Sequence, residues 1–392
     1  MQEIKNSDKI KRFIKNNDLI TIIIISFIVF CLLVWVFYTL NLKESSCIKL
    51  DNIYKNGKYK TSSFLTTNGN VKGEAKELTN KYNYFDNENI SLFKNYYIKT
   101  AYNCCCGDGY KNNFVNKCAL VNCINLGARC LDFEIYSYNS EPIIAASTAN
   151  NNSIKETYNY LKLSDVLSIL NEQCFNEKYT QCSHDPMFLH FRIMSENKVI
   201  YDKMGDYIDD YLNEGSDYLL DTSKYNYKNP DKDNLYLQKL SNFKKKFVIM
   251  VNTLYTTTLD NSKLGNYVNI KSGTNNMKLY RFENIVAQGK NNELLIDDCK
   301  TNMLMVLPNI DNKLDNYDPI SVFNNGCQFI AMKFQSLDNN LVGYLNQFKN
   351  YGGYSFILKP YSLRRDIIPQ EIPPENHALN QPRSYSVGGT IK

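Results

Sequence analysis

The chain has 392 residues, and its hydrophobic content of 43% and charged content of 22% are ordinary for a globular protein. A net charge of +5 is small for this length, and no Lys/Arg cluster carries interleaved aromatic residues, so the sequence does not predict a nucleic-acid partner. This length suffices for one large domain or two smaller ones. The heavy use of Asn, Lys, Ile and Tyr is interpreted as the mark of an AT-rich genome.

The first predicted element is a membrane anchor. Residues 19–40, "LITIIIISFIVFCLLVWVFYTL", form a run of 22 residues without a charge, which is long enough to cross a bilayer as a helix. A cleaved signal peptide is the alternative, but the run is too long and lacks a small-residue cleavage site. Residues 1–18 form its N-terminal flank. Basic residues lie on both sides of the run, and those nearest to it, Arg12, Lys15 and Lys43, favour a cytoplasmic N-terminus.

Residues 41–94 are polar and are predicted to form a stalk with at most one helix. Of the 12 cysteines, Cys31 lies in the anchor and the others follow it. So many cysteines in the large domain favour a lumenal or external location with disulfides, and free core thiols are the alternative. The run Cys104–Cys106 is expected to supply a bridge, whereas Cys130 and Cys327 lie in strand-like segments and are expected to stay free. The sequons at Asn89 and Asn151 fit the same location.

Strand-like runs alternate with helical stretches from Ile98 onward. The strand-like runs are "CLDFEIY", "EPIIAA", "MFLHFRI", "KKFVIMVN", "MLMVLP", "GCQFIAMKF" and "GYSFILKP". The segment "LKLSDVLSILNEQCF" has apolar residues at helical spacing, with Ser164 as the predicted N-cap. This alternation predicts parallel βα units, and hence an α/β barrel or a doubly wound sheet. Residues 203–240 are expected to form a helix and a loop, residues 256–278 a linker, and residues 366–392 a Pro-rich extended tail.

Two acids stand out in the first of these strands. Asp132 and Glu134 are two positions apart, so both point to one face of the strand while Leu131, Phe133 and Ile135 point to the other. Such acids either face water or share a cation or a reacting group.

Several segments together resemble eukaryotic phosphoinositide-specific phospholipase C. "GARCLDFEIYSYNSEPII", "LKLSDVLSIL" and "DPMFLHF" resemble its first catalytic half, and "NYDPISVFNNGCQFIAMKFQS" and "GGYSFILKPYSLR" its second. The resemblance implies a distorted TIM barrel of the PLC-like phosphodiesterase type, with an X-like half over 95–255 and a Y-like half over 279–365. It also implies an active site at the carboxyl ends of the strands. The lipid-targeting domains usual in the family are not recognisable, and a membrane helix stands in their place.

In the family, two acids on this strand bind calcium, and Asp132 and Glu134 match them with Asp and Glu interchanged. The family's other two ligand positions, an Asn and a Glu, fall on Thr100 and Arg192. Calcium takes six to eight oxygens, and a cation at a ligand position would instead pair with the acids. We therefore predict an internal ion pair and no bound calcium or other cofactor.

The resemblance places the two catalytic histidines at Lys99 and Ala146. Alanine transfers no proton, and a lysine acts as a base only with a strongly depressed pKa. Of the remaining histidines, His184, His190 and His377, only His190 alternates onto the same face as Arg192, which makes it the weak candidate for a chemical role.

Residues that hold the anionic substrate are also replaced. The family's two phosphate-binding lysines fall on Met250 and Asn252, and its Arg and Tyr before a proline fall on Met305 and Leu307. With scaffold residues kept and chemical residues changed, the sequence predicts a pseudoenzyme.

Three functions therefore compete. The preferred one is a membrane-anchored, catalytically inactive barrel that acts as a structural or interaction module, with the bilayer and an unidentified protein as partners. The alternatives are an active phosphodiesterase that uses His190, Asp132 and Glu134, and a non-catalytic lipid or ligand receptor. Composition suggests a large DNA virus or a protist as the source, so a viral membrane protein is one hypothesis.

Overall fold

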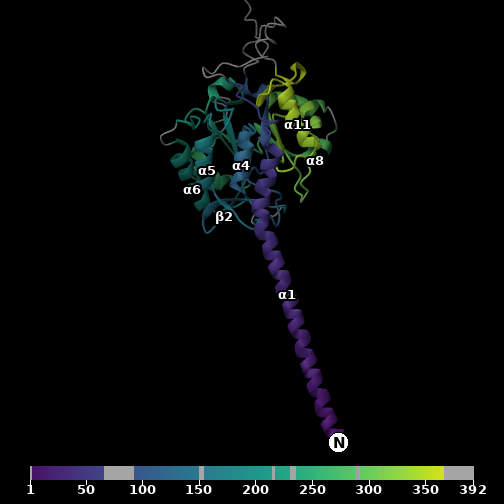
Figure 1. Ribbon diagram of the computed structural model, residues 1–392. Helices are drawn as coiled ribbons and strands as arrows, with labels where there is room; N and C mark the ends of the chain where they lie inside the picture. The colour runs from purple at the N-terminus through teal and green to yellow at the C-terminus, as the bar shows by residue number, and fades with distance from the viewer. Residues whose placement is uncertain are drawn as a thin grey trace, which may run out of the picture.

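The computed structural model describes residues 2–65, 92–149, 154–213, 217–229, 235–287, 289, 292–311 and 313–365, with side chains from Asp18 onward. The predicted tail at 366–392, the sequons at Asn89 and Asn151, and His377 lie outside these residues. The fold consists of a long N-terminal helix and a nearly closed barrel (Figure 1).

Eight parallel strands form the barrel wall in the order β7-β6-β5-β2-β1-β10-β9-β8. They are β1 (Tyr96–Ala101), β2 (Cys130–Tyr138), β5 (Met187–Ile193), β6 (Phe247–Thr253), β7 (Ile270–Lys271), β8 (Met277–Arg281), β9 (Met303–Leu307) and β10 (Phe329–Met332). Three short antiparallel strands extend the sheet: β3 (Glu141–Ala145) on β2, β4 (Leu161–Lys162) on β3, and β11 (Phe356–Leu358) on β1. The α/β barrel that the sequence predicts is confirmed.

The seam of the barrel lies between β7 and β8. Strand β7 pairs with β6, and β8 pairs with β9. Only residues 272–276 separate β7 from β8 along the chain. The backbone N–H groups of Gly273 and Thr274 both donate to the carbonyl of Met277, at 2.8 and 3.1 Å. One short stretch of chain therefore crosses from one side of the seam to the other.

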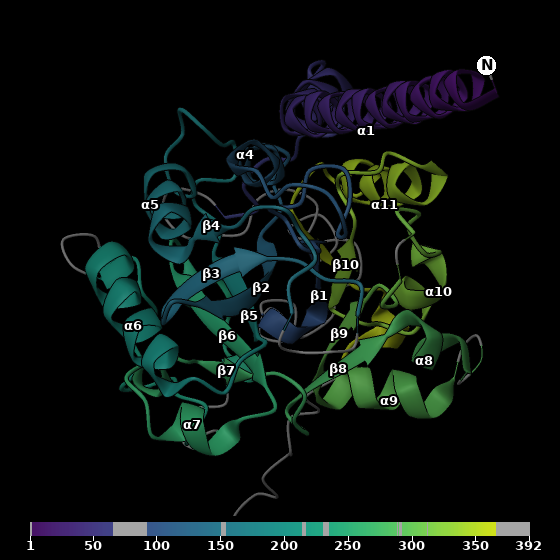
Figure 2. The ribbon, with the colours of Figure 1, turned by 90° about the horizontal axis from the view of Figure 1, so that it is seen from below.

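Helices surround the barrel, as the view along its axis shows (Figure 2). They are α4 (Lys117–Asn125), α5 (Leu163–Gln173), α6 (Lys198–Ile208), α7 (Thr256–Asp260), α8 (Phe282–Ala287), α9 (Glu293–Thr301), α10 (Pro319–Asn324) and α11 (Asn339–Asn350). The α5 helix buries Leu163, Val166, Leu167 and Leu170, the one-sided apolar spacing that the sequence shows. It begins two residues earlier than predicted, with Lys162 rather than Ser164 at the N-cap.

The predicted linker over 256–278 is part of the barrel. It contains α7, the short helix Leu264–Asn266, β7 and the start of β8. Its polar composition hid these elements because β7 is only two residues long and α7 only five. Short elements give too few repeats for a hydrophobic period to be visible.

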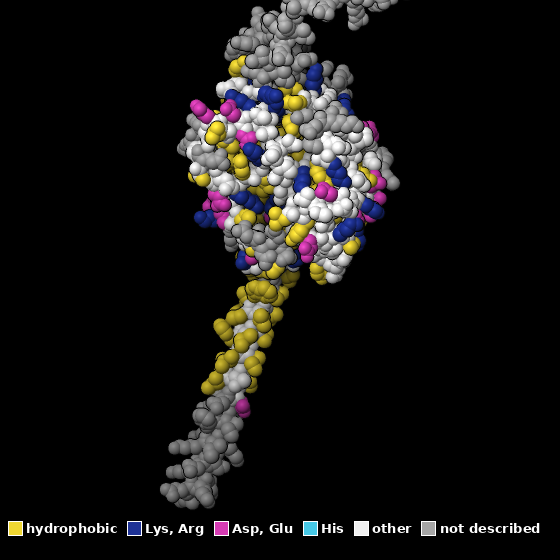
Figure 3. Space-filling model, turned by 180° about the vertical axis from the view of Figure 1, so that it is seen from behind, with side chains coloured by type: hydrophobic (Ala, Val, Ile, Leu, Met, Phe, Trp, Pro, Cys, Tyr) yellow, Lys and Arg dark blue, Asp and Glu magenta, His cyan; other side chains and the backbone are white. Residues whose placement is uncertain are grey.

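The helix α1 (Gln2–Tyr54) contains the predicted anchor and continues past it without a break. From Asp18 onward it is long and apolar enough to cross a membrane. Figure 3 shows its apolar side chains uncovered below the domain. Residues 41–54, the first part of the predicted stalk, are helical, which agrees with the one helix allowed there, and the last turns of α1 pack against α4. Residues 66–91 lie outside the described residues.

A disulfide between Cys47 and Cys118 fastens α1 to α4. The predicted bridge from the run Cys104–Cys106 is wrong, because these three thiols are free and buried. Cys130 and Cys327 are free thiols in this structure, as predicted. A bridge between residues 71 positions apart depends on how α1 packs, which Cys spacing does not reveal.

The contacts of α1 fix which end of the barrel lies next to the apolar segment. Asn116 Nδ2 donates to the carbonyl of Lys43 at 3.3 Å and to Ser46 Oγ at 3.0 Å, and Lys49 pairs with Asp108. Asn116 and Asp108 lie in the loop after the carboxyl end of β1. Cys47 follows Leu40 by seven residues, about 10 Å of helix. The carboxyl ends of the strands therefore face the apolar segment.

Candidate functional site

The register of the barrel gathers the predicted residues into two rows. Pairing of β2, β5 and β6 places Asp132, His190 and Met250 in one row, and Glu134, Arg192 and Asn252 in the next. Because paired residues of parallel strands point to the same face, both acids meet the residues of β5 inside the barrel. All but Asn252 are buried.

The guanidinium of Arg192 explains why Asp132 and Glu134 of β2 point to the same place. Its Nε donates to Asp132 Oδ1 at 2.9 Å and its Nη2 to Asp132 Oδ2 at 2.8 Å. Its Nη1 donates to Glu134 Oε1 at 2.8 Å. The predicted ion pair is therefore present, and it involves both acids.

Asn103 completes this cluster. Its Oδ1 accepts a 2.8 Å hydrogen bond from Arg192 Nη2, and its Nδ2 donates to Glu134 Oε1 at 3.1 Å. The second oxygen of Glu134 accepts from the Tyr136 hydroxyl at 2.9 Å and from the backbone of Ser147 at 3.0 Å. The ring of Tyr102 stacks on Arg192, with 4.8 Å from the guanidinium carbon to the ring centroid.

His190 joins the cluster to the seam of the barrel. Its Nδ1 lies 2.8 Å from Asp132 Oδ1 and its Nε2 lies 2.8 Å from Ser272 Oγ. The order Ser–His–Asp is that of a nucleophilic triad. However, all three side chains are buried, and Asp132 is already committed to Arg192. A nucleophile needs space for a substrate beside it, so the geometry favours a satisfied internal network.

The charges of this network stabilise one another. Burial by itself would raise the pKa of Asp132, but Arg192 and His190 outweigh burial and hold that pKa well below its usual range. Burial likewise opposes the charge of Arg192, but Asp132, Tyr102 and Glu134 outweigh it and raise its pKa. The structure therefore keeps Asp132 ionised and Arg192 protonated.

A divalent cation would need the oxygens that Arg192 uses. The side chains of Asn103, Asp132 and Glu134 all point at the guanidinium, whose positive charge would repel calcium at that point. Among the described residues, no group of three His, Cys, Asp or Glu is arranged to hold a metal. The residues present do not fit the calcium site that the resemblance implies.

Two predicted positions lie away from the acids. The Lys99 side chain points away from the acids, and its Nζ donates to the carbonyls of Leu126 at 2.6 Å and Tyr59 at 3.0 Å. Thr100 Oγ1 donates to the carbonyl of Ile98. Neither residue is hydrogen-bonded or ion-paired to Asp132 or Glu134, so the two positions that the resemblance assigns to a histidine and an asparagine lie apart from the acid cluster.

Two residues further along the chain do contact the cluster. Tyr102 and Asn103 follow the end of β1; the ring of Tyr102 lies over Arg192, and Asn103 accepts a hydrogen bond from it. One general rule could have pointed to these residues. Site side chains of barrel enzymes come from the ends of strands, whereas Lys99 lies inside β1. Sequence reasoning missed Asn103 and Ser272, and also the surrounding contacts of Tyr102, Tyr136 and Ser147.

The other predicted positions line the barrel without forming a charged site. Ala146 directly follows β3, and Met250, Met305 and Leu307 are buried apolar residues of β6 and β9. Asn252 Nδ2 donates to the carbonyl of Ser272 at 3.1 Å. Within the described chain, Arg192 is the cation that contacts the acids, and both carboxylates already bond it.

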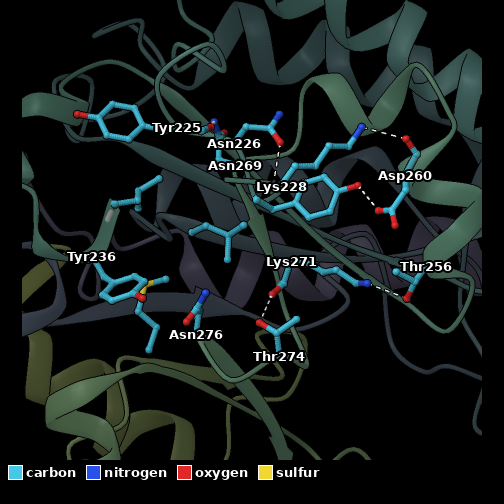
Figure 4. Close-up of a pocket in the computed structure, with 14 residues that line it drawn as sticks. Tyr225, Asn226, Lys228, Tyr236, Thr256, Asp260, Asn269, Lys271, Thr274 and Asn276 are labelled. Atoms are coloured by element: carbon cyan, nitrogen blue, oxygen red, sulfur yellow. Dashed lines mark hydrogen bonds between the residues drawn. The ribbon is translucent and has the colours of Figure 1, made fainter. Parts of the chain in front are cut away.

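Space at the acids is closed. The gap bounded by Asn103, Asp132, Glu134 and Ala145 has no room for a water molecule. A cavity of about 600 Å³ lies elsewhere, at the seam (Figure 4). Its lining includes Tyr225, Tyr236 and Asn276 and the two cations Lys228 and Lys271.

Comparisons with known proteins agree with this fold. Residues 249–362 match the family described as "Phosphatidylinositol-specific phospholipase C, Y domain". A stretch of 49 residues is 41% identical to the rat (Rattus norvegicus) 1-phosphatidylinositol 4,5-bisphosphate phosphodiesterase delta-1, which is 12% of this chain and 6% of that protein. The Y-domain match begins before the Y-like half predicted at 279 and includes β7 and Ser272.

Two solved structures share the barrel. PLC21 of S. officinalis matches 70% of this chain with a TM-score of 0.55 and 19% identity, and PLC21 of L. pealei matches 70% with 0.54 and 18%. The chain spans only 38% of the length of either protein. Together, these findings show that the chain has the barrel fold of PLC-like phosphodiesterases and that residues 249–362 resemble the Y domain.

Proposed function

We propose that the protein is a single-pass membrane protein whose PLC-like barrel has no phosphodiesterase activity and serves as a structural or interaction module. The observation that carries the proposal is the position of Arg192, which bonds both acids and Asn103 at once. Phosphodiester cleavage by an internal hydroxyl needs a base, an acid and charge stabilisation on the phosphate. Here both acids are paired with Arg192, and among the described residues no further Lys or Arg contacts them to face a phosphate group.

The residues at the proton-transfer positions support the same conclusion. Ala146 carries no ionisable group, and the side chain next to Asn103 that contacts Arg192 is the phenol of Tyr102. Burial raises the pKa of Tyr102 above its ordinary value of about 10. A phenol with such a pKa is a poor base at neutral pH.

The anchor and the side of the membrane are part of the proposal. The apolar part of α1 is uncovered by the domain, as a bilayer-spanning helix must be. The bond between Cys47 and Cys118 favours a lumenal or external barrel, since disulfides persist in oxidising compartments. The partners would then be the bilayer, through residues 19–40, and a second protein. A viral or protist source remains a prediction from composition.

Hydrolysis of phosphoinositide vesicles by the purified full-length protein tests the activity. We expect no release of inositol phosphate with calcium or with a chelator, and no change in His190→Ala or Glu134→Gln. Release by the wild-type protein that either substitution abolishes would show that His190 and Glu134 are catalytic, and would reject the proposal.

A second candidate function is ligand binding at the seam cavity. The two lysines in the cavity lining favour an anionic ligand. Lys228 Nζ donates to the carbonyl of Asp260 at 2.9 Å and Lys271 Nζ to Thr256 Oγ1 at 2.7 Å (Figure 4). Neither ammonium group makes a recorded ion pair with a carboxylate, so each can still bind an anion. Inorganic phosphate should then raise the melting temperature of the wild type and not of Lys228→Met/Lys271→Met. An equal response of the two proteins would reject this candidate.

A further inference from the structure

Two free thiols face each other in the second half of the barrel. Cys299 lies in the last turn of α9 and Cys327 lies two residues before β10. Their sulfur atoms are 3.7 Å apart, and both residues are buried. A disulfide needs a sulfur separation of about 2.0 Å, so closing the gap requires a movement of less than 2 Å, which side-chain rotation can supply in part.

The backbone around Cys327 brings the two residues together. Gly326 has a φ of +76°, and a Cβ built at this glycine would lie 3.6 Å from Cys299 Cβ. The turn that ends α10 therefore runs against the last turn of α9. Approach of the two cysteines is a property of the packed fold and needs no rearrangement of elements.

A cation lies beside this pair. Lys359 Nζ donates to the carbonyl of Cys299 at 3.4 Å. Burial and the neighbouring Cys299 raise the pKa of the Cys327 thiol well above its ordinary value, and Lys359 opposes both. The closed core thus keeps the Cys327 thiol protonated and slow to react, while the Lys359 ammonium group favours its thiolate when the core opens.

We propose that Cys299 and Cys327 form a disulfide whenever the folded domain meets an oxidising thiol–disulfide pool. The oxidant is a disulfide, either a small one such as oxidised glutathione or that of an oxidoreductase. One cysteine loses its proton and attacks the oxidant, which releases one thiol and leaves a mixed disulfide. The second cysteine loses its proton and displaces the other thiol, so two thiols are oxidised and one disulfide is reduced.

The bond would link α9, which precedes β9 in the chain, to the residues just before β10, the next strand of the barrel. It would close a loop between residues 28 positions apart, which restricts the unfolded chain. For a domain of this size the expected increase in melting temperature is about 5–10 °C.

The test is a disulfide map of the purified full-length protein after incubation in oxidising glutathione buffer and alkylation of the remaining thiols. We expect a cross-linked peptide pair containing Cys299 and Cys327, while Cys130 and Cys174 are alkylated. Under conditions in which Cys47 and Cys118 are found bonded, recovery of Cys299 and Cys327 as alkylated thiols, or each as a mixed disulfide with glutathione, would overturn the proposal.

Thermal melting provides the matched comparison. A reductant should lower the melting temperature of the oxidised wild type by about 5–10 °C more than that of Cys299→Ala/Cys327→Ala, because both proteins share the Cys47–Cys118 bond. Cys130→Ala, a buried thiol away from the pair, should show the full wild-type decrease. Equal decreases in the wild type and the double variant would contradict the bond. Comparing each protein with and without reductant cancels any packing defect that the alanines cause.

Discussion

Arg192 holds Asp132 through two parallel hydrogen bonds, from Nε at 2.9 Å and from Nη2 at 2.8 Å. This two-point contact fixes the plane of the guanidinium, so its remaining nitrogen points at Glu134. One cation thereby neutralises two buried carboxylates, and the two acids no longer need a metal ion to offset their repulsion.

Removal of this cation should destabilise the domain strongly. Arg192→Met keeps much of the volume but leaves two buried carboxylates without a counter-charge, and we expect a loss of about 3–5 kcal/mol in the free energy of unfolding. Chemical denaturation in detergent measures it. Lys198→Ala, which breaks an exposed pair with Asp202, should change stability by less than about 0.5 kcal/mol. An equally small change in the free energy of unfolding of Arg192→Met would show that the guanidinium does not stabilise the two buried carboxylates.

Reversal of the charge should create a cation site. In Arg192→Glu, a third carboxylate joins Asp132, Glu134 and the Asn103 amide, which is an oxygen set that suits calcium. We expect the variant to be less stable than the wild type in a chelator and to gain melting temperature as calcium is added. The wild type should show no calcium-dependent change. Identical melting of the variant with calcium and with chelator would reject this expectation.

Buried Lys99 should make stability depend on pH above neutrality. Burial lowers the pKa of Lys99 to about 7, whereas an unfolded lysine titrates near 10.4. Between these values the unfolded state binds more protons, so stability rises with pH, by up to about 1.4 kcal/mol per pH unit for this group. Denaturation at pH 7 to 10 measures the slope. Lys99→Met should reduce it, while Lys198→Met on the surface should not; unchanged slopes in both would contradict the assignment.

Loss of the Cys47–Cys118 bond should loosen α1 from the barrel. The bond closes a loop between residues 71 positions apart, so Cys47→Ser/Cys118→Ser should cost roughly 2–4 kcal/mol. Hydrogen exchange should increase in residues 43–54 and in α4. Cys31→Ser, within the apolar segment and outside any bond, is the control and should leave both quantities unchanged.

Gly127 should tolerate no side chain. Its φ is +84°, and a Cβ there would lie 2.1 Å from Thr61 Oγ1 and 2.8 Å from Ser355 Oγ. Gly127→Ala should therefore cost about 3 kcal/mol or more, from strain and overpacking together. Gly343→Ala is the matched control: it lies within α11 with no atom within 4 Å of the added carbon, and should stabilise by about 0.5–1 kcal/mol. Thermal melting of the two variants should shift in opposite directions.

Alternation along the strands predicted the centre of the site well. Asp132, Glu134, His190 and Arg192 lie on two adjacent long strands, β2 and β5, where the two-residue period assigns a face to every side chain. The ion pair was predicted from the resemblance, which places Arg192 at a ligand position beside the two acids, and from its charge. Apolar strands separated by helical segments predicted parallel βα units, and the resemblance selected the barrel over a doubly wound sheet.

Residues outside regular elements escaped prediction. Asn103 lies past the end of β1 with a positive φ of 42°, where no period applies, and Ser272 lies in the turn at the seam. Their contacts depend on closure of the barrel, which brings the ends of β1, β5 and β7 together. The Cys47–Cys118 bond similarly depends on α1 continuing as a helix beyond the apolar run, which a polar sequence at 41–54 does not reveal.

The unbroken helix between the apolar segment and the disulfide also couples the barrel to rotation of that segment. A helix is stiff to torsion over two turns, and Cys47 lies only seven residues from Leu40, so if α1 spans a bilayer as proposed, its rotation about its own axis swings the whole barrel through the same angle. If two anchors associate through a given helix face, the mutual orientation of their barrels is then set within the membrane. Sequence changes among the apolar residues of α1 would thus alter which surfaces two neighbouring barrels present to each other, without any change in the barrels.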